Sequence, residues 1–273
     1  MNKEKYLDVV LNFLCDESGI DNNASSFDEK VSLWRKLVNE RDVKDIPDDV
    51  LDAEDKFLRF QLFNKKLTNG EELKPVNELM DIDIKHGDKI CLWKGDITSI
   101  YCDAIVNSGN SSMLGCFIPE CKCIDNCIHS FSGIRLRKKC NVIMNNSELK
   151  VSDVLITRAY NLPCDFIIHT VGPEINGDLT NDDKEALKNT YINILDCAKN
   201  NLVKTLVFCC ISTGENKFPK NEACKIAVDT VNEYLDVNDK FFSNIIFDVF
   251  TDEDFDIYEE YLTKYKRDYY LFF

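Results

Sequence analysis

The chain has 273 residues, of which 44% are hydrophobic and 11% are aromatic, and its 33 basic and 48 acidic residues give a formal charge of -15. The apolar fraction excludes disorder over most of the chain. The acidic balance argues against non-specific binding to nucleic acid or to an anionic membrane surface. The 13 cysteines are an odd number, the first residues are too polar for a signal peptide, and no apolar run is long enough to span a membrane. We therefore expect reduced thiols in a cytoplasmic protein.

Residues 1–80 are predicted to form a helical extension that packs on the main domain. A short apolar helix comes first, and Ser26 and Glu29 have the spacing of a capping box that opens a second helix. A third helix is predicted to begin at Pro47 and to end near Asn69. The first part of the chain is therefore expected to be entirely helical.

Residues 81–273 change to strands that alternate with helices. Apolar and β-branched runs, typical of strands buried on both faces, lie at 89–93, 103–106, 166–171, 205–211 and 245–250. Apolar residues at helical spacing lie at 187–198, 223–234 and 258–265. This alternation predicts a three-layer α/β/α domain with a mixed, largely parallel sheet. In such sheets ligands bind beyond the carboxyl ends of the strands.

Small polar residues follow three of the predicted strands. They lie at 95–98, 107–111 and 212–216. Each segment alone could be an ordinary surface turn, but their position at successive strand ends favours a ligand crevice. The last segment leads into a helix that is expected to begin near Pro219, and the free N–H groups of such a helix end suit a diphosphate.

Four cysteines fall within twelve positions, at Cys116, Cys121, Cys123 and Cys127. A cluster of core cysteines is one interpretation, but the Gly, Pro, Glu and Lys residues between them are typical of a loop. Close thiolates on a loop that enters a helix predict a zinc site in a reduced compartment. Four ligands would close a structural site, and three would leave a catalytic position open. Cys127 lies one helical turn beyond Cys123, so the spacing leaves both alternatives open.

Asp125 follows the third of these cysteines, where the predicted helix begins. It could be an ordinary acid in the first turn of a helix, or the carboxylate that orients water or a sugar hydroxyl beside the metal. His129 lies four residues later and is expected to be its structural partner. His169, within a predicted strand, is expected to be a core histidine.

Several of these segments together resemble a macrodomain, the ADP-ribose-binding α/β/α fold. The similar motifs lie at 95–98, 103–107, 110–111, 169–173, 211–214 and 218–219. The cysteine segment at 115–126 and the N-terminal helical region are similar to the zinc-dependent branch, which removes mono-ADP-ribose from proteins. The resemblance covers roughly residues 25–265 and implies that 81–273 form the macrodomain.

The resemblance also implies an ADP-ribose-binding site. Asp96 and Ile97 would contact adenine, with Phe250 as a further adenine neighbour, and Asn110 would hold the distal ribose. The residues that would wrap the diphosphate and that ribose are Ser212, Thr213, Gly214, Glu215, Asn216 and Phe218.

By the same resemblance, zinc would be bound by Cys116, Cys121 and Cys123, next to Asp125. The middle ligand of the family is typically histidine, whereas Cys121 stands here. The family usually has a small apolar residue where this chain has Cys127, so a fourth thiolate ligand is the competing arrangement.

The implied function is a hydrolase that cleaves the bond between the distal ribose and a protein side chain, with Asn110 and Asp125 as catalytic residues. Its substrate would be a mono-ADP-ribosylated protein and its product ADP-ribose. Family members often accompany a lipoyl carrier protein and a sirtuin-type transferase. One alternative is an ADP-ribose reader with a structural four-cysteine zinc site, and another is an interaction protein with a vestigial crevice.

Overall fold

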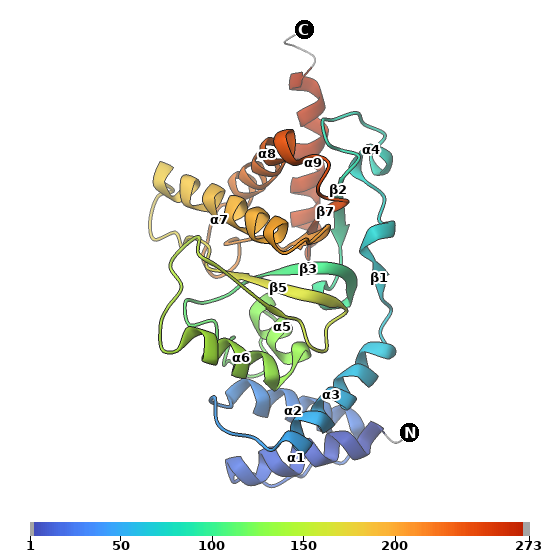
Figure 1. Cartoon of the computed structure of the whole chain (residues 1–273), viewed down its shortest axis with the longest axis vertical. Coiled ribbons are helices and arrows are strands. Elements are labelled where there is room, and N and C mark those ends of the chain that lie inside the picture. The colour runs from blue at the N-terminus through green and yellow to red at the C-terminus, as the bar shows by residue number, and fades with distance from the viewer. Residues whose placement is uncertain (1–2, 270–273) are drawn as a thin grey trace.

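A mixed sheet forms the centre of the protein, as a computed structural model of residues 3–269 shows (Figure 1). Its strands are β1 (Thr68–Asn69), β2 (Ile90–Lys94), β3 (Ile100–Ser108), β4 (Val154–Arg158), β5 (Cys164–Thr170), β6 (Thr205–Phe208) and β7 (Asn244–Val249). The strand order is β2-β7-β6-β3-β5-β4, and β1 pairs with β3. The paired strands are parallel except for β4 and β5, which are antiparallel. The predicted mixed, largely parallel sheet is confirmed.

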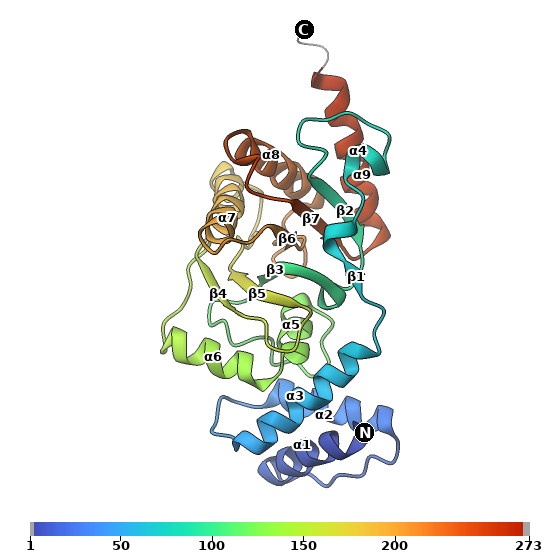
Figure 2. The same cartoon turned by 45° about the vertical axis from the view of Figure 1, so that its right-hand side comes forward.

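Helices cover both faces of this sheet (Figures 1 and 2). One face carries α5 (Ile124–Ser132) and α6 (Ile134–Met144), and the other carries α7 (Asn181–Asn200), α8 (Lys220–Asn238) and α9 (Asp252–Tyr269). The apolar side chains of the central strands are buried between these layers, as the β-branched runs predict. The expected α/β/α architecture is therefore confirmed. Among the described residues, no helix has the length and apolar character needed to cross a bilayer.

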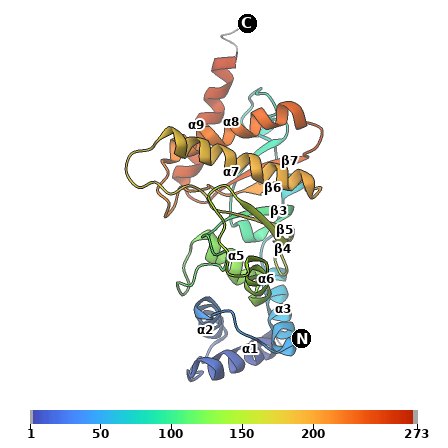
Figure 3. The ribbon, with the colours of Figure 1, turned by 60° about the vertical axis from the view of Figure 1, so that its left-hand side comes forward.

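The N-terminal helices have a hydrophobic core of their own. These helices are α1 (Lys3–Ser18), α2 (Phe27–Glu40) and α3 (Asp48–Phe63), and they lie beyond α5 and α6 (Figure 3). Trp34 and Phe57 are fully buried in this core, and Ile134 of α6 joins it. The capping box of Ser26 and Glu29 is present. The predicted ranges 1–80 and 81–273 also include residues 1–2 and 270–273, which lie outside the described residues.

The connection between the two parts differs from the prediction. The third helix does not continue to Asn69 but ends at Phe63, and β1 follows it as a short strand beside β3. A 3-10 turn at Gly70–Glu72 and a short helix α4 (Val76–Leu79) come next. A Cβ on Gly70 would lie 2.7 Å from the carbonyl oxygen of Tyr101, so this glycine allows the segment to approach β3 closely.

A buried glutamate joins α3 to the start of α6. Glu54 Oε1 accepts a hydrogen bond of 3.0 Å from Trp34 Nε1, and its Oε2 accepts one of 2.7 Å from the backbone N–H of Ile134. The N-cap residue of α6, Gly133, provides no side-chain cap, so Glu54 satisfies a free N–H group of that helix. Burial raises the pKa of Glu54 to about 7 although both hydrogen bonds oppose this shift.

This raised pKa predicts a pH-dependent docking of the N-terminal helices. Between the ordinary pKa of 4.5 and about 7, the folded state binds more protons at Glu54 than the unfolded state, so stability falls as pH rises. We expect the free energy of unfolding of Glu54→Gln, relative to the parent, to rise from about pH 5 to about pH 8 in denaturant titrations. Asp49→Asn, which changes an exposed carboxylate on the same helix, is the control. A Glu54→Gln difference that does not change with pH would contradict the assignment.

Candidate functional site

The cysteine loop enters α5 directly, and this junction forms the centre of the site. Cys123 is the N-cap residue of α5, and its sulfur accepts the backbone N–H of Asn126 at 3.4 Å. Thiolates are favoured at such a position because the N–H groups and the positive end of the helix face them. Asp125 therefore stands in the first turn of α5, beside the central strand β3.

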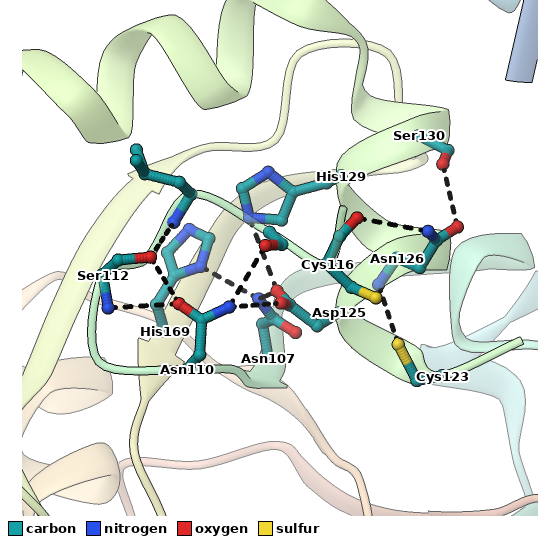
Figure 4. A network of polar contacts seen from close by, with 12 residues as sticks. Asn107, Asn110, Ser112, Cys116, Cys123, Asp125, Asn126, His129, Ser130 and His169 are labelled. Atoms are coloured by element: carbon teal, nitrogen blue, oxygen red, sulfur yellow. Dashed lines mark hydrogen bonds and ion pairs between the residues drawn. The ribbon is translucent and has the colours of Figure 1, made fainter. Parts of the chain in front are cut away.

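Asp125 is buried, with 7% of its surface exposed, and side chains from the end of β3 and the loop after it point to its carboxylate (Figure 4). Asn107 Nδ2 donates to Asp125 Oδ1 at 2.8 Å, and Asn110 Nδ2 lies 3.5 Å from Oδ2. Burial raises the pKa of Asp125 to about 6, and the hydrogen bond from Asn107 and the charge of Arg137 act against this rise. The two residues predicted to be catalytic, Asn110 and Asp125, are thus brought together.

Asn107 connects Asp125 to a second buried layer. Its Nδ2 also lies 3.2 Å from Nδ1 of His169, whose Nε2 lies 2.9 Å from Oγ1 of Thr157. Burial holds the pKa of His169 well below its usual value, so the ring is neutral, as expected of a core histidine. The sequence includes Asn107 in a polar segment but gives no sign of its contact with Asp125, because that contact needs α5 to pack on β3.

His129 is the other neighbour of Asp125. Its Nε2 lies 3.5 Å from Asp125 Oδ1, and neither ring nitrogen has a hydrogen-bond partner among residues 3–269. Burial lowers the pKa of His129 to about 3, so the two side chains are not an ion pair at neutral pH. A Cβ on Gly115, whose φ is +83°, would lie 2.7 Å from Cγ of this ring. The glycine before the first cysteine therefore lets the loop pack on His129.

Three of the four clustered cysteines converge. The sulfurs of Cys116, Cys121 and Cys123 all lie within 4.8 Å of one another, and each side chain is half-buried. Burial raises the pKa of the Cys123 thiol, and the crowding by Cys116 and Cys121 raises it further. A bound divalent cation would reverse this effect, because it favours the thiolate form of its ligands.

Cys127 lies outside this group of three sulfurs. Its Sγ accepts a hydrogen bond of 3.4 Å from Nη2 of Arg35, which belongs to α2. Burial raises the pKa of the Cys127 thiol, and the Arg35 guanidinium acts in the opposite direction. Three of the four clustered sulfurs therefore lie together, and that of Cys127 is turned toward Arg35.

The loop after β6 is held by its own hydrogen bonds and leaves several polar groups without a partner among the described residues. Ser212 has a φ of +65°, and its buried Oγ has no hydrogen-bond partner in the described part of the chain. The loop closes through a 3.0 Å hydrogen bond from the N–H of Phe218 to the carbonyl of Ser212, and Asn216 Nδ2 donates to the carbonyl of Gly172 at 3.0 Å. No hydrogen bond engages the N–H groups of residues 213–216 within the described residues, and α8 begins at Lys220, close to the predicted position.

The residues expected near adenine lie at the ends of two paired strands. Asp96 caps the 3-10 turn after β2, and its Oδ2 accepts a 3.0 Å hydrogen bond from Lys65. Ile97 is 5% exposed, whereas Phe250, directly after β7, is 73% exposed. An exposed aromatic ring at a strand end is available for stacking. All predicted site residues thus lie at the carboxyl ends of β2, β3, β6 and β7, or in the loop and first turn of α5.

Comparisons with known proteins agree with this geometry. The chain matches the Macro domain family over residues 106–227. It is 40% identical over 238 residues to a protein-ADP-ribose hydrolase of Treponema medium. The aligned residues cover 86% of this chain and 88% of that protein. A solved Trypanosoma brucei macrodomain in complex with ADP is 25% identical, with a TM-score of 0.63 over 85% of this chain and 96% of that chain. An Oceanobacillus iheyensis macrodomain with ADP is 36% identical, with a TM-score of 0.57 over 63% of this chain and 89% of that chain.

The sheet between two helical layers and the loops at its carboxyl edge define the chain as a macrodomain. At 40% identity over most of both chains, it belongs to the protein-ADP-ribose hydrolase family. The expected macrodomain fold and the expected enzyme family are therefore confirmed.

The contact between Gly115 and His129 predicts a large cost for a small substitution. Gly115→Ala would place a Cβ inside the His129 ring contact and would also strain the left-handed backbone, so we expect a loss of ~1–3 kcal/mol in the free energy of unfolding. Gly19→Ala is the matched control, because Gly19 has a φ of +65° but no atom within 4 Å of its ideal Cβ. Equal losses in the two variants would show that the backbone, not the contact with His129, sets the cost.

Proposed function

We propose that the protein is a zinc-dependent hydrolase that removes mono-ADP-ribose from modified proteins by cleaving the bond between the distal ribose and the side chain. The observation that carries this proposal is the group of three cysteine sulfurs on the loop that leads to the buried Asp125. The substrate class is supported by the relationship to the Treponema medium protein-ADP-ribose hydrolase and by the ADP in a related macrodomain.

The cysteine loop fits a zinc ion. Cys116, Cys121 and Cys123 offer three sulfurs that are close enough to share one ion, and thiolates are common zinc ligands in a reduced compartment. Three protein ligands leave a fourth position open, as catalytic zinc sites do. When bound, zinc would supply Lewis acidity toward a water or a ribose oxygen.

Asp125 and Asn110 would carry the proton and hold the sugar. A water oxygen bonds to the ribose carbon while the bond from that carbon to the protein side chain breaks. Asp125 accepts a proton from the water and later releases it to solvent, while the leaving side chain takes up a proton from solvent, so the only other reactant is the water. Asn110, whose amide lies 3.5 Å from the Asp125 carboxylate, positions the distal ribose next to it.

The loop after β6 would bind the diphosphate. The N–H groups of residues 213–216 and the hydroxyl of Ser212 are available as donors, and the N-terminus of α8 adds a positive field. Asp96, Ile97 and Phe250 would bind adenine, with the exposed Phe250 ring as the stacking surface.

The competing function is an ADP-ribose reader with a closed four-cysteine zinc site. The position of the Cys127 sulfur against Arg35 favours the open site and so the hydrolase. A mono-ADP-ribosylated protein as substrate and ADP-ribose as product belong to the proposal. A cytoplasmic location stays a prediction from the cysteine content and the polar first residues. An association with a lipoyl carrier protein and a sirtuin-type transferase stays a prediction from the resemblance.

Substitutions should separate the role of zinc from that of the Asp125 carboxylate. Cys123→Ala is expected to lose zinc and activity, because one of three ligands is removed. Asp125→Asn is expected to keep zinc and to lower kcat by ~10²–10⁴-fold, because a proton acceptor is removed. Zinc per chain and release of ADP-ribose from a mono-ADP-ribosylated protein are the measurements.

Cys127→Ala is the matched control for these variants, and it is expected to keep both zinc and turnover. Loss of zinc in Cys127→Ala, together with a parent that releases no ADP-ribose, would overturn the hydrolase and support the reader.

Substrate binding should depend on Gly172. A Cβ on this residue would lie 2.1 Å from Oγ of Ser212 and 2.8 Å from Cγ2 of Ile211, so Gly172→Ala would displace the loop after β6. We expect the Kd for ADP-ribose, measured by calorimetry, to rise at least ~10-fold with zinc content unchanged, which corresponds to about 1.4 kcal/mol. Gly214→Ala, where the ideal Cβ meets nothing within 4 Å, is the control. An unchanged Kd in Gly172→Ala would exclude this loop as the diphosphate site.

A further inference from the structure

Arg35 of α2 reaches from the N-terminal helices to the cysteine loop. Its Nη2 donates to the carbonyl of Cys121 at 2.9 Å, to Oδ1 of Asn126 at 3.0 Å and to Sγ of Cys127 at 3.4 Å. Its guanidinium carbon also lies 5.5 Å from the centre of the Phe131 ring, and the side chain is half-buried. One side chain therefore holds three points of the loop and of the first turn of α5.

Asn126 extends this contact to the beginning of the loop. Its Nδ2 donates to the carbonyl of Cys116 at 3.3 Å (Figure 4). It also donates to the carbonyl of Ile118 at 3.0 Å. Asn126 thus joins the first turn of α5 to the beginning of the cysteine loop, and Arg35 in turn holds Asn126. Two further contacts join α2 to the same region. Glu120 accepts from the Ser32 hydroxyl at 2.7 Å, and its N–H donates to Asn39 at 3.0 Å.

Cys127 is the residue most able to disturb the three-sulfur group. It lies four residues after Cys123, and Cβ atoms at this helical spacing are ~5–6 Å apart, a separation that two sulfurs on one metal ion can bridge. Its sulfur is instead directed to Arg35. A fourth thiolate would fill the open position that hydrolysis needs.

We propose that Arg35 is a positioning residue that keeps Cys127 away from the metal and so holds the site at three thiolates with an open position. This inference rests on the proposed zinc-dependent function. It gives the N-terminal helices a direct part in the site, because the residue that keeps the position open comes from α2. Its positive charge beside the loop also offsets part of the negative charge that three thiolates bring to the ion.

Cobalt substitution tests this proposal without relying on activity alone. The intensity of sulfur-to-cobalt charge-transfer absorption rises with the number of thiolate ligands, so Co²⁺ titrations report how many cysteines bind. The variants are Arg35→Gln, Cys127→Ala and the double variant. Arg135→Gln is the control, because Arg135 also joins the main domain to the N-terminal helices. Within the described residues its hydrogen bonds and ion pairs go to Asp52 and Asp55 and not to the loop.

The parent, Cys127→Ala and Arg135→Gln are expected to give the same three-thiolate spectrum. Arg35→Gln is expected to gain roughly one third in charge-transfer intensity per cobalt, as a fourth thiolate joins three, and its zinc form is expected to lose ADP-ribose release. The double variant is expected to return to the three-thiolate spectrum and to regain turnover. If Arg35→Gln does not fold, Arg35→Lys replaces it, because an ammonium cannot hold the same three acceptors and the spectrum should change in the same direction.

An Arg35→Gln or Arg35→Lys spectrum identical to that of the parent would overturn the role of Arg35 while leaving the proposed hydrolase intact. A double variant that does not regain turnover would also overturn it, since the loss would then not depend on Cys127. A parent that binds neither cobalt nor zinc would overturn both this inference and the zinc-dependent function.

Discussion

The hydrogen bond from Asn107 to Asp125 holds the site together, because it joins the end of the central strand to the first turn of α5. Cys123 is the N-cap residue of the same helix, and the amide of Asn110 lies 3.5 Å from the Asp125 carboxylate. A carboxylate can be kept this deeply buried only when its oxygens have donors. Asn107 is itself held by the neutral His169 beneath it. The orientation of the Asp125 carboxylate is thus set by Asn107 and His169, two buried residues that need not contact the ligand.

The loops at the sheet edge and the cysteine loop are positioned in different ways. The loops after β2, β6 and β7 meet at one edge because parallel strands carry their carboxyl ends there. The cysteine loop, in contrast, is also contacted from outside the sheet and its helical layers, by Arg35, Ser32 and Asn39 of α2. The buried Glu54 joins α3 to the start of α6. The N-terminal extension therefore does more than cover an apolar face, since its side chains reach the loop that is proposed to bind zinc.

Much of the fold could be predicted from the sequence, because β-branched runs and helical spacing are local signals. The strand after Phe63 could not be, since β1 is only two residues long and pairs with β3 for reasons of chain path. The spacing predicted that the cysteines cluster, and the family resemblance, not the spacing, singled out Cys116, Cys121 and Cys123. The contact that turns the Cys127 sulfur toward Arg35 could not be predicted, because Arg35 lies 92 positions earlier in the chain. The role of Asn107 was missed for the same reason, since its partner lies 18 residues away on another layer. Contacts between layers depend on how the helices pack on the sheet, and a local sequence pattern does not predict them.

X-ray absorption at the zinc edge of the zinc-loaded protein distinguishes an open three-thiolate site on the loop that leads to Asp125 from a closed site with four thiolates. For the open site we expect three sulfur neighbours at ~2.3 Å and a shorter contact to oxygen or nitrogen at ~2.0 Å, at the exchangeable position. Addition of ADP-ribose should change that shorter contact and leave the three sulfurs in place. Four sulfur neighbours, with no change on adding ADP-ribose, would contradict the open site and with it the proposed hydrolysis.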